Sequence, residues 1–174
     1  VDAKLSIKTR YPFGNAVSMS MAWDNPAVES IATTVCIRMP SWMAAPLAVT
    51  INGKTAATAG KPGTFLALNR TWLLNDTIAF ELPEVLTLSQ YTGEDQIPGY
   101  EGRRYALKMG PIVLAAVGAL DGGSSSITLP LPPSNISSWL VPVPGQPLHF
   151  TAKGTGVVFK PMWTIGNAAF TTYP

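Results

Sequence analysis

The feature that most constrains this chain is the recurrence of apolar residues at every second position. Leu5 and Ile7 alternate with lysine and serine, and Val17, Met19 and Met21 alternate with alanine and serine. A period of two places one set of side chains on one face of a β-strand. No stretch keeps a helical apolar spacing for three turns without an intervening proline or glycine. We therefore predict an all-β fold of antiparallel strands, each with one buried face.

Turn residues divide these strands at short intervals. Asn52-Gly53 lies between two short alternating segments, and both residues tolerate the positive φ that a type I′ hairpin turn requires. The 16 prolines and 15 glycines punctuate the rest of the chain. Many short strands with frequent turns are typical of a sandwich or barrel. We predict an antiparallel β-sandwich, jelly-roll-like, that forms a single domain over residues 1–174.

Two stretches interrupt the pattern of strands. Residues 93–104 are polar and charged, which predicts a long surface loop. Residues 121–147 are rich in glycine, serine and proline, which indicates a linker or an excursion over the surface. The apolar segments in residues 148–174 are too few for a separate core. We expect them to be strands that return to the same domain.

Composition excludes several classes of protein. Hydrophobic residues make up 47% of the chain and charged residues only 13%, the opposite of a disordered chain. No apolar run is long enough for a membrane span, and the basic residues are scattered, unlike those of a nucleic-acid binder. One cysteine and one histidine exclude an intrachain disulfide and a Cys/His metal cage. We expect no metal, cofactor, nucleic-acid partner or membrane partner.

Three triplets match the acceptor pattern for N-glycosylation, and they begin at Asn69, Asn75 and Asn135. All three fall in segments that the sequence predicts to be turns. The first residues show no signal-peptide pattern. The triplets favour a secreted, extracellular glycoprotein, and we expect that location.

Six motifs between residues 5 and 118 are informative because of the order in which they occur. A weaker match follows at Phe159-Lys160-Pro161 and Phe170–Tyr173. The six motifs are Tyr11-Pro12-Phe13-Gly14-Asn15, Ile37-Arg38-Met39-Pro40-Ser41-Trp42, Val49-Thr50-Ile51-Asn52-Gly53, Pro62-Gly63-Thr64-Phe65, Arg70-Thr71-Trp72, and Arg104-Tyr105-Ala106-Leu107 continuing through Gly110-Pro111-Ile112-Val113-Leu114-Ala115. This order resembles the region that follows the catalytic barrel in glycoside hydrolase family 127, the β-L-arabinofuranosidase-like family.

The resemblance implies a non-catalytic role. In that family the reaction resembles retaining hydrolysis by a zinc-bound cysteine, and those groups belong to the barrel that precedes the matched region. The resemblance thus implies a C-terminal accessory β-sandwich domain whose partner is the catalytic barrel. Cys36 lies mid-strand between apolar residues, where a cysteine is most often a packing residue. An autonomous glycosidase is disfavoured, because no nucleophile, base or metal set is present in the sequence.

Contact with a polysaccharide or oligosaccharide is the leading functional hypothesis. Tryptophan and tyrosine rings can stack on the apolar faces of sugars while polar side chains bond the hydroxyls. We predict that Trp23, in a polar turn, and Tyr100 bind carbohydrate with Asp95 and Arg103 as hydrogen-bonding groups. The alternative for the acidic cluster Glu94, Asp95 and Glu101 is a solvated loop with surface ion pairs. We predict that His149 is a surface or half-buried residue.

A structural role is the alternative function. A sandwich beside a barrel buries apolar surface and stiffens the enzyme, and it can also mediate a homodimer contact. The low charge of the chain favours a surface intended for a neighbour. Trp42 and Trp72 belong to the family-like motifs, and we expect them to pack in the core or on the barrel-facing surface.

Overall fold

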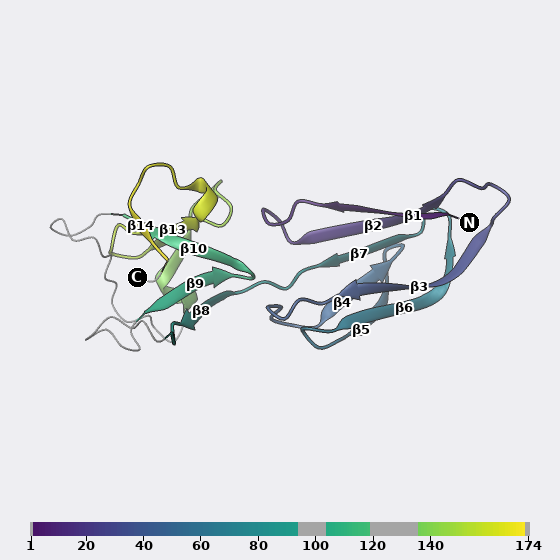
Figure 1. The fold of residues 1–174 in the computed structure, drawn as a ribbon, viewed down its shortest axis with the longest axis horizontal. Coiled ribbons are helices and arrows are strands. Elements are labelled where there is room, and N and C mark those ends of the chain that lie inside the picture. Colours follow the sequence, from purple (N-terminus) through teal and green to yellow (C-terminus); the bar gives the residue numbers. More distant parts are fainter. Residues whose placement is uncertain (1, 94–103, 119–135, 173–174) are drawn as a thin grey trace. The chain divides into compact units, whose positions relative to one another are not determined.

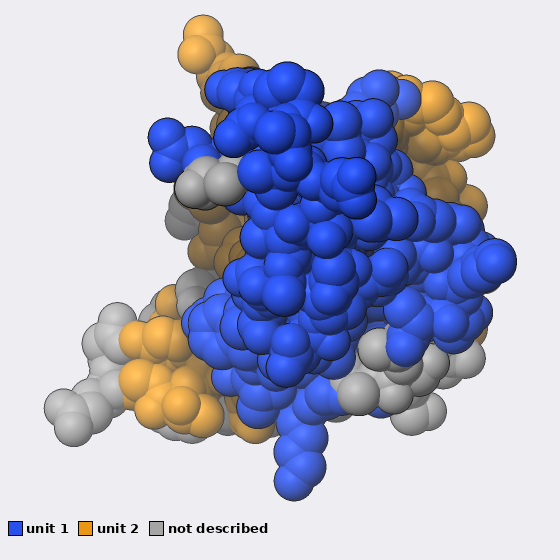
Figure 2. Space-filling view, turned by 90° about the vertical axis from the view of Figure 1, so that its right-hand side faces the viewer, with its two compact units in different colours: residues 1–84 blue, residues 85–174 orange. Residues whose placement is uncertain are grey.

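Strands make up almost all of the regular structure, which confirms the all-β, antiparallel prediction (Figure 1). The computed structural model describes residues 2–93, 104–118 and 136–172. Every pairing between strands in these ranges is antiparallel. The chain divides into two units, Val1–Glu84 (unit 1) and Val85–Pro174 (unit 2), drawn in blue and orange in Figure 2. No helix in the described ranges is both long and apolar enough to cross a bilayer.

Unit 1 contains seven strands in two sheets of unequal size. The larger sheet has five strands in the order β1 (Ala3–Thr9), β2 (Ala16–Trp23), β7 (Thr77–Glu81), β4 (Leu47–Ile51) and β5 (Lys54–Ala59). The smaller sheet pairs β3 (Ser30–Arg38) with β6 (Phe65–Leu73) over nine residues. The inward residues of both sheets form a single core, so unit 1 is a β-sandwich.

The alternation in the sequence decides which side chains enter this core. Val17, Phe80 and Val49 lie in one row across β2, β7 and β4, and all three are buried. From the smaller sheet, Trp72 is fully buried, and its indole Nε1 donates a hydrogen bond to the Thr33 carbonyl at 3.0 Å. The buried indole thereby keeps its one polar atom satisfied.

The β4–β5 turn has the predicted type I′ signature. Asn52 and Gly53 have φ angles of 51° and 75°, both in the left-handed region. The Asn52 side chain also joins this turn to the β6–β7 turn, because its Nδ2 donates to the Asp76 carboxylate at 2.6 Å. Its Oδ1 accepts the backbone N–H of Thr77 at 2.9 Å. One residue thus joins a turn of the five-stranded sheet to the turn that connects the two sheets.

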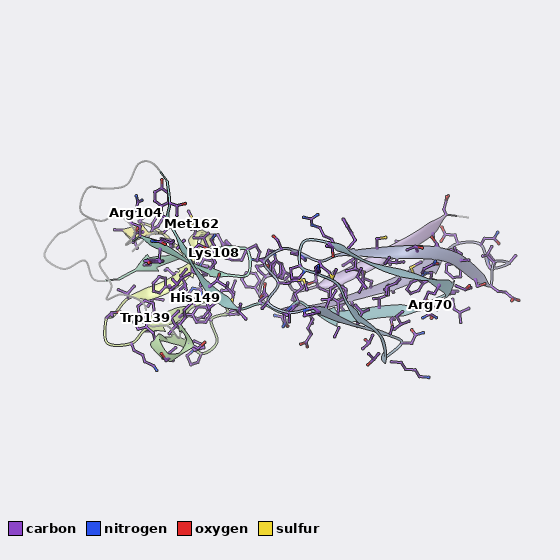
Figure 3. All side chains as sticks on the ribbon, turned by 90° about the horizontal axis from the view of Figure 1, so that it is seen from below. Arg70, Arg104, Lys108, Trp139, His149 and Met162 are labelled. Carbon is purple, nitrogen blue, oxygen red and sulfur yellow. The ribbon has the colours of Figure 1, made fainter. Side chains whose placement is uncertain are left out.

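Asp76 is the anion at the centre of this connection. It is only 4% exposed, its Oδ2 accepts the Leu73 backbone N–H at 2.9 Å, and Arg70 Nη2 lies 3.5 Å from the same oxygen. Arg70, labelled in Figure 3, also lies over the Trp72 ring at 5.0 Å. The hydrogen bonds from Leu73 and Asn52 lower the pKa of the Asp76 carboxyl from its ordinary value of 3.8, against the opposing effect of burial.

Unit 2 contains a seven-stranded sheet. Its strands run in the order β11 (Leu140–Pro142), β12 (Phe150–Ala152), β13 (Val158–Pro161), β10 (Ile112–Val117), β9 (Tyr105–Met109) and β8 (Leu86–Gln90), and β14 (Phe170–Thr171) also pairs with β10. The short helix α1 (Ile136–Trp139) and the 3₁₀ turn η2 (Met162–Thr164) complete the unit. Trp139 packs edge-on against Phe159 at 5.7 Å in a core that includes Leu114 and Phe150.

The structure refines two expectations about organisation. The strands of residues 148–174 do return, but they join the sheet of unit 2, where β13 and β14 pair with β10. They contribute to a core separate from that of unit 1. Part of the expected excursion, residues 140–142, is a strand of that sheet. The single domain over residues 1–174 stays a prediction, because two units with separate cores can form one domain or two. The jelly-roll connectivity also stays a prediction.

We predict that Asp76→Asn destabilises unit 1 by about 1–3 kcal/mol at neutral pH, since a buried, charge-assisted hydrogen-bond network is lost. Because the folded-state pKa of Asp76 lies below its unfolded value, the stabilisation is complete above that value. It is lost as the pH falls from about 4 through the lowered folded-state pKa. Urea unfolding at pH 7 and at pH 3 measures both effects. An equal difference between variant and parent at the two pH values would contradict the assignment.

Candidate functional site

Trp23, the central residue of the predicted carbohydrate site, is a core residue. It is only 6% exposed, and its Nε1 donates to the Val28 carbonyl at 2.7 Å. The prediction of a surface stacking ring at Trp23 is therefore wrong. The sequence carried the signal: Trp23 continues the odd-numbered series of Val17, Met19 and Met21, so β2 reaches into the segment that was interpreted as a polar turn.

The other three predicted binding residues, Asp95, Tyr100 and Arg103, lie outside the described residues, as do Glu94 and Glu101 of the acidic cluster. Tyr91, which follows β8, and Arg104, which precedes β9, lie opposite each other. The Tyr91 N–H donates to the Arg104 carbonyl at 2.8 Å, and the guanidinium lies 4.5 Å from the Tyr91 ring centre. The described residues therefore bring none of the four predicted site residues together.

The remaining tryptophans differ in how much ring they present to solvent. Trp72 is buried as expected, and the half-buried Trp42 stacks on Tyr11 with the ring centres 6.2 Å apart. Trp139 is half-buried against the core of unit 2. Trp163, in η2, keeps 55% of its surface exposed. Of the five tryptophans, Trp163 is the most exposed to solvent.

An open groove of about 810 Å³ lies on the outer face of the five-stranded sheet in unit 1. Its floor exists because one row across β2, β7 and β4 carries only small side chains, Ser18, Ala79 and Thr50. Lys8 and Glu81 are among the charged groups that line it. Hydroxyl and charged groups can bond a sugar here, but the one aromatic ring in the lining, Phe80, is buried. The groove offers no exposed ring for stacking.

In the part of the chain that the structure describes, the residues with reactive side chains show no catalytic arrangement. Cys36 is exposed on the outer face of β3, which corrects its expected role in packing; it alternates with Val35 and Ile37, so the period of two already placed it outward. His149, labelled in Figure 3, is half-buried as predicted, and its Nδ1 lies 2.9 Å from the Pro147 carbonyl oxygen. Within the described ranges, no group of three or more His, Cys, Asp or Glu side chains could hold a metal ion.

Comparisons with known proteins agree with this division of the chain. Residues 2–84 match the family model of the GH127 middle domain of β-L-arabinofuranosidases. The model is named for a middle domain, and the C-terminal placement that the resemblance implied is not confirmed. A search of curated proteins found no match.

Three solved structures share the fold. A protein described as a glycoside hydrolase is 18% identical with a TM-score of 0.64, and the match covers 97% of this chain and 31% of that one. A GH127 β-L-arabinofuranosidase from Geobacillus stearothermophilus T6 is 24% identical with a TM-score of 0.53, over 70% of this chain and 18% of that one. A GH127 β-arabinofuranosidase is 17% identical with a TM-score of 0.57, and the match covers 97% of this chain and 31% of that one. This chain spans a third or less of their length.

We predict that Trp23→Ala destabilises unit 1 by about 3–5 kcal/mol, because it leaves a cavity in the core and removes the partner of the Val28 carbonyl. Chemical denaturation followed by circular dichroism measures the loss. Trp163→Ala serves as the matched control, with an expected change within about 0.5 kcal/mol because most of that ring is exposed. Equal effects of the two substitutions would contradict the burial of Trp23.

Proposed function

We propose that this chain is a non-catalytic β-sandwich region of a GH127-type β-L-arabinofuranosidase and that it packs against the catalytic domain of a longer polypeptide. One observation carries the proposal: the segment that matches the GH127 middle domain, residues 2–84, coincides with unit 1, which ends at Glu84. A segment that folds around its own core is the kind of piece that evolution retains as a domain.

The unequal sheets of unit 1 supply a surface for this packing. Leu5 and Ile7 on β1 pair with Met21 and Met19 on β2, so their side chains lie on the core side of the five-stranded sheet. Only two strands form the opposing layer, and β1 is exposed along its whole length. Leu5 is 40% exposed and Ile7 61%. An apolar strip on the core side of an edge strand favours a protein partner over solvent.

We expect Ile7→Asp to lower the melting temperature of the longer enzyme by several degrees, since it would bury a charge in the proposed contact. The same substitution should leave the melting temperature of this chain alone nearly unchanged, because Ile7 is exposed here. Phe65→Asp is the matched control, as Phe65 is 60% exposed on the outer face of β6. Calorimetry of both proteins makes the comparison.

If Ile7→Asp and Phe65→Asp lower the melting temperature of the longer enzyme equally, the contact does not lie on β1. The isolated chain should hydrolyse no aryl β-L-arabinofuranoside, whereas the longer enzyme should. Hydrolysis by the isolated chain would overturn the accessory role itself, whatever the position of the contact.

Glycan contact is a second function, and the exposure of Trp163 favours it. Trp163 follows β13 and remains 55% exposed, although four other tryptophans of the chain are buried or half-buried. A large exposed indole provides the flat apolar face on which a sugar ring can stack. In this proposal Trp163 takes the stacking role that the sequence had suggested for Trp23.

We expect Trp163→Ala to weaken binding of the chain to soluble arabinan about tenfold, because a stacking contact contributes about 1.4 kcal/mol. Affinity electrophoresis in gels with increasing arabinan concentration gives the dissociation constants. Phe65→Ala, which removes an exposed ring from unit 1, should leave the retardation unchanged. A parent chain that arabinan does not retard, or equal losses in the two variants, would reject the glycan contact.

A further inference from the structure

Two asparagines on the surface of unit 1 have the chemistry of a modification site. Three of the seven asparagines in the chain begin an Asn-X-Ser/Thr triplet, and two of these, Asn69 and Asn75, are described. Asn135 lies outside the described residues. We propose that the chain passes through a secretory pathway and that Asn69 and Asn75 carry N-linked glycans on unit 1.

The position of Asn69 differs from the sequence expectation, but the residue is exposed. It lies inside β6 and not in a turn, and it pairs with Thr34 on β3. Asn69 and Thr71 alternate with the buried Leu68 and Trp72, so both face outward, and both are exposed. Their cross-strand neighbours, Thr34 and Ala32, are small. The outer face of this two-stranded sheet therefore has room for a bulky substituent.

Asn75 occupies the turn between β6 and β7. Its φ of 66° is in the left-handed region, which asparagine adopts more readily than most residues. Its backbone N–H donates to the Met21 carbonyl at 3.0 Å, and the following Asp76 anchors the turn in the core. Asn75 and Thr77 are both exposed. The backbone fixes the turn without any contribution from the Asn75 side chain.

Two other asparagine side chains of unit 1 make hydrogen bonds that support the fold. The Asn52 amide makes hydrogen bonds to Asp76 and Thr77, and Asn25 Oδ1 accepts the Ala27 N–H at 3.0 Å. Among the described residues, the side-chain amides of Asn69 and Asn75 make no hydrogen bond of this kind. The fold consequently leaves both amide nitrogens available for modification, with no network that the glycan would break.

The covalent step needs a lipid-linked oligosaccharide pyrophosphate as donor. The side-chain amide nitrogen of asparagine bonds to C1 of the first sugar and loses one proton. The C1–O bond to the pyrophosphate breaks, and the lipid pyrophosphate leaves with the electron pair. The threonine hydroxyl two residues later completes the acceptor triplet, and Thr71 and Thr77 provide it.

Glycans at these asparagines would give unit 1 one face covered by sugar and another face that is open to a protein partner. A sugar on Asn69 would cover the outer face of the β3–β6 sheet and prevent another domain from packing there. The apolar side of β1 carries Leu5 and Ile7 and has no acceptor triplet, so it stays open to a protein partner. The glycan sites follow from Asn69 and Asn75 alone and do not depend on the proposed function.

The test is to express the full chain behind a signal peptide in a eukaryotic host and to map the glycopeptides. Peptide-N-glycosidase converts an occupied asparagine to aspartate, which mass spectrometry locates. We expect occupancy at Asn69 and Asn75, and loss of one glycan in each of the variants Asn69→Gln and Asn75→Gln. Thr71→Ala should also abolish the glycan at Asn69. Asn15→Gln, at an exposed asparagine that begins no acceptor triplet, is the matched control and should change nothing.

Three outcomes count against the proposal. A secreted, folded chain that is unmodified at both asparagines rejects it, and occupancy at only one rejects the assignment of the other. The melting temperature gives a second readout, because a glycan on an open face should leave it unchanged or raise it relative to the enzymatically deglycosylated chain. A lower melting temperature of the glycosylated chain would show that the face is not free to carry the sugar.

Discussion

The structure of unit 1 depends on one packing constraint: a two-stranded sheet has to cover a five-stranded one. Trp72, on the smaller sheet, is fully buried, and the inward rows of β2, β7 and β4 form the rest of the core. Because two strands are too narrow to cover five, the outermost strand β1 leaves Leu5 and Ile7 exposed on the core side. The same imbalance defines the surface that we assign to a protein partner.

Polar interactions fix the geometry at the end of that core. Asn52 and Asp76 connect two turns that are distant in sequence, and Arg70 supplies charge to the carboxylate while it covers the Trp72 ring. A buried carboxylate is costly unless hydrogen bonds and a cation compensate for the lost water. The triplet at Asn75 belongs to the same turn, so the group that holds the turn and the group open to modification are adjacent residues with opposite roles.

The candidate sites were harder to foresee than the fold. The neighbours Asp24, Asn25 and Pro26 predict a polar turn around Trp23, yet β2 extends as far as Trp23 and buries the ring. Propensity identified the turn correctly but placed it a residue or two too early. The exposure of Trp163 has no counterpart in the sequence, because the residues around it alternate no more clearly than those around Trp139. Exposure depends on which distant strand packs against a ring, and local sequence does not specify that.

The sequence by itself determined the antiparallel strands, the inward face of each strand, and the type I′ turn at Asn52-Gly53, because these follow from a period of two and from local backbone preferences. Even the outward position of Cys36 and the inward position of Trp23 were present in the alternation. Only the tertiary structure decided how many strands oppose each face, that the chain has two cores, and that Asn69 lies in an exposed strand. Those properties arise from contacts between segments far apart in the chain. A local pattern shows which face of a strand is apolar, but it does not show which distant segment packs against that face.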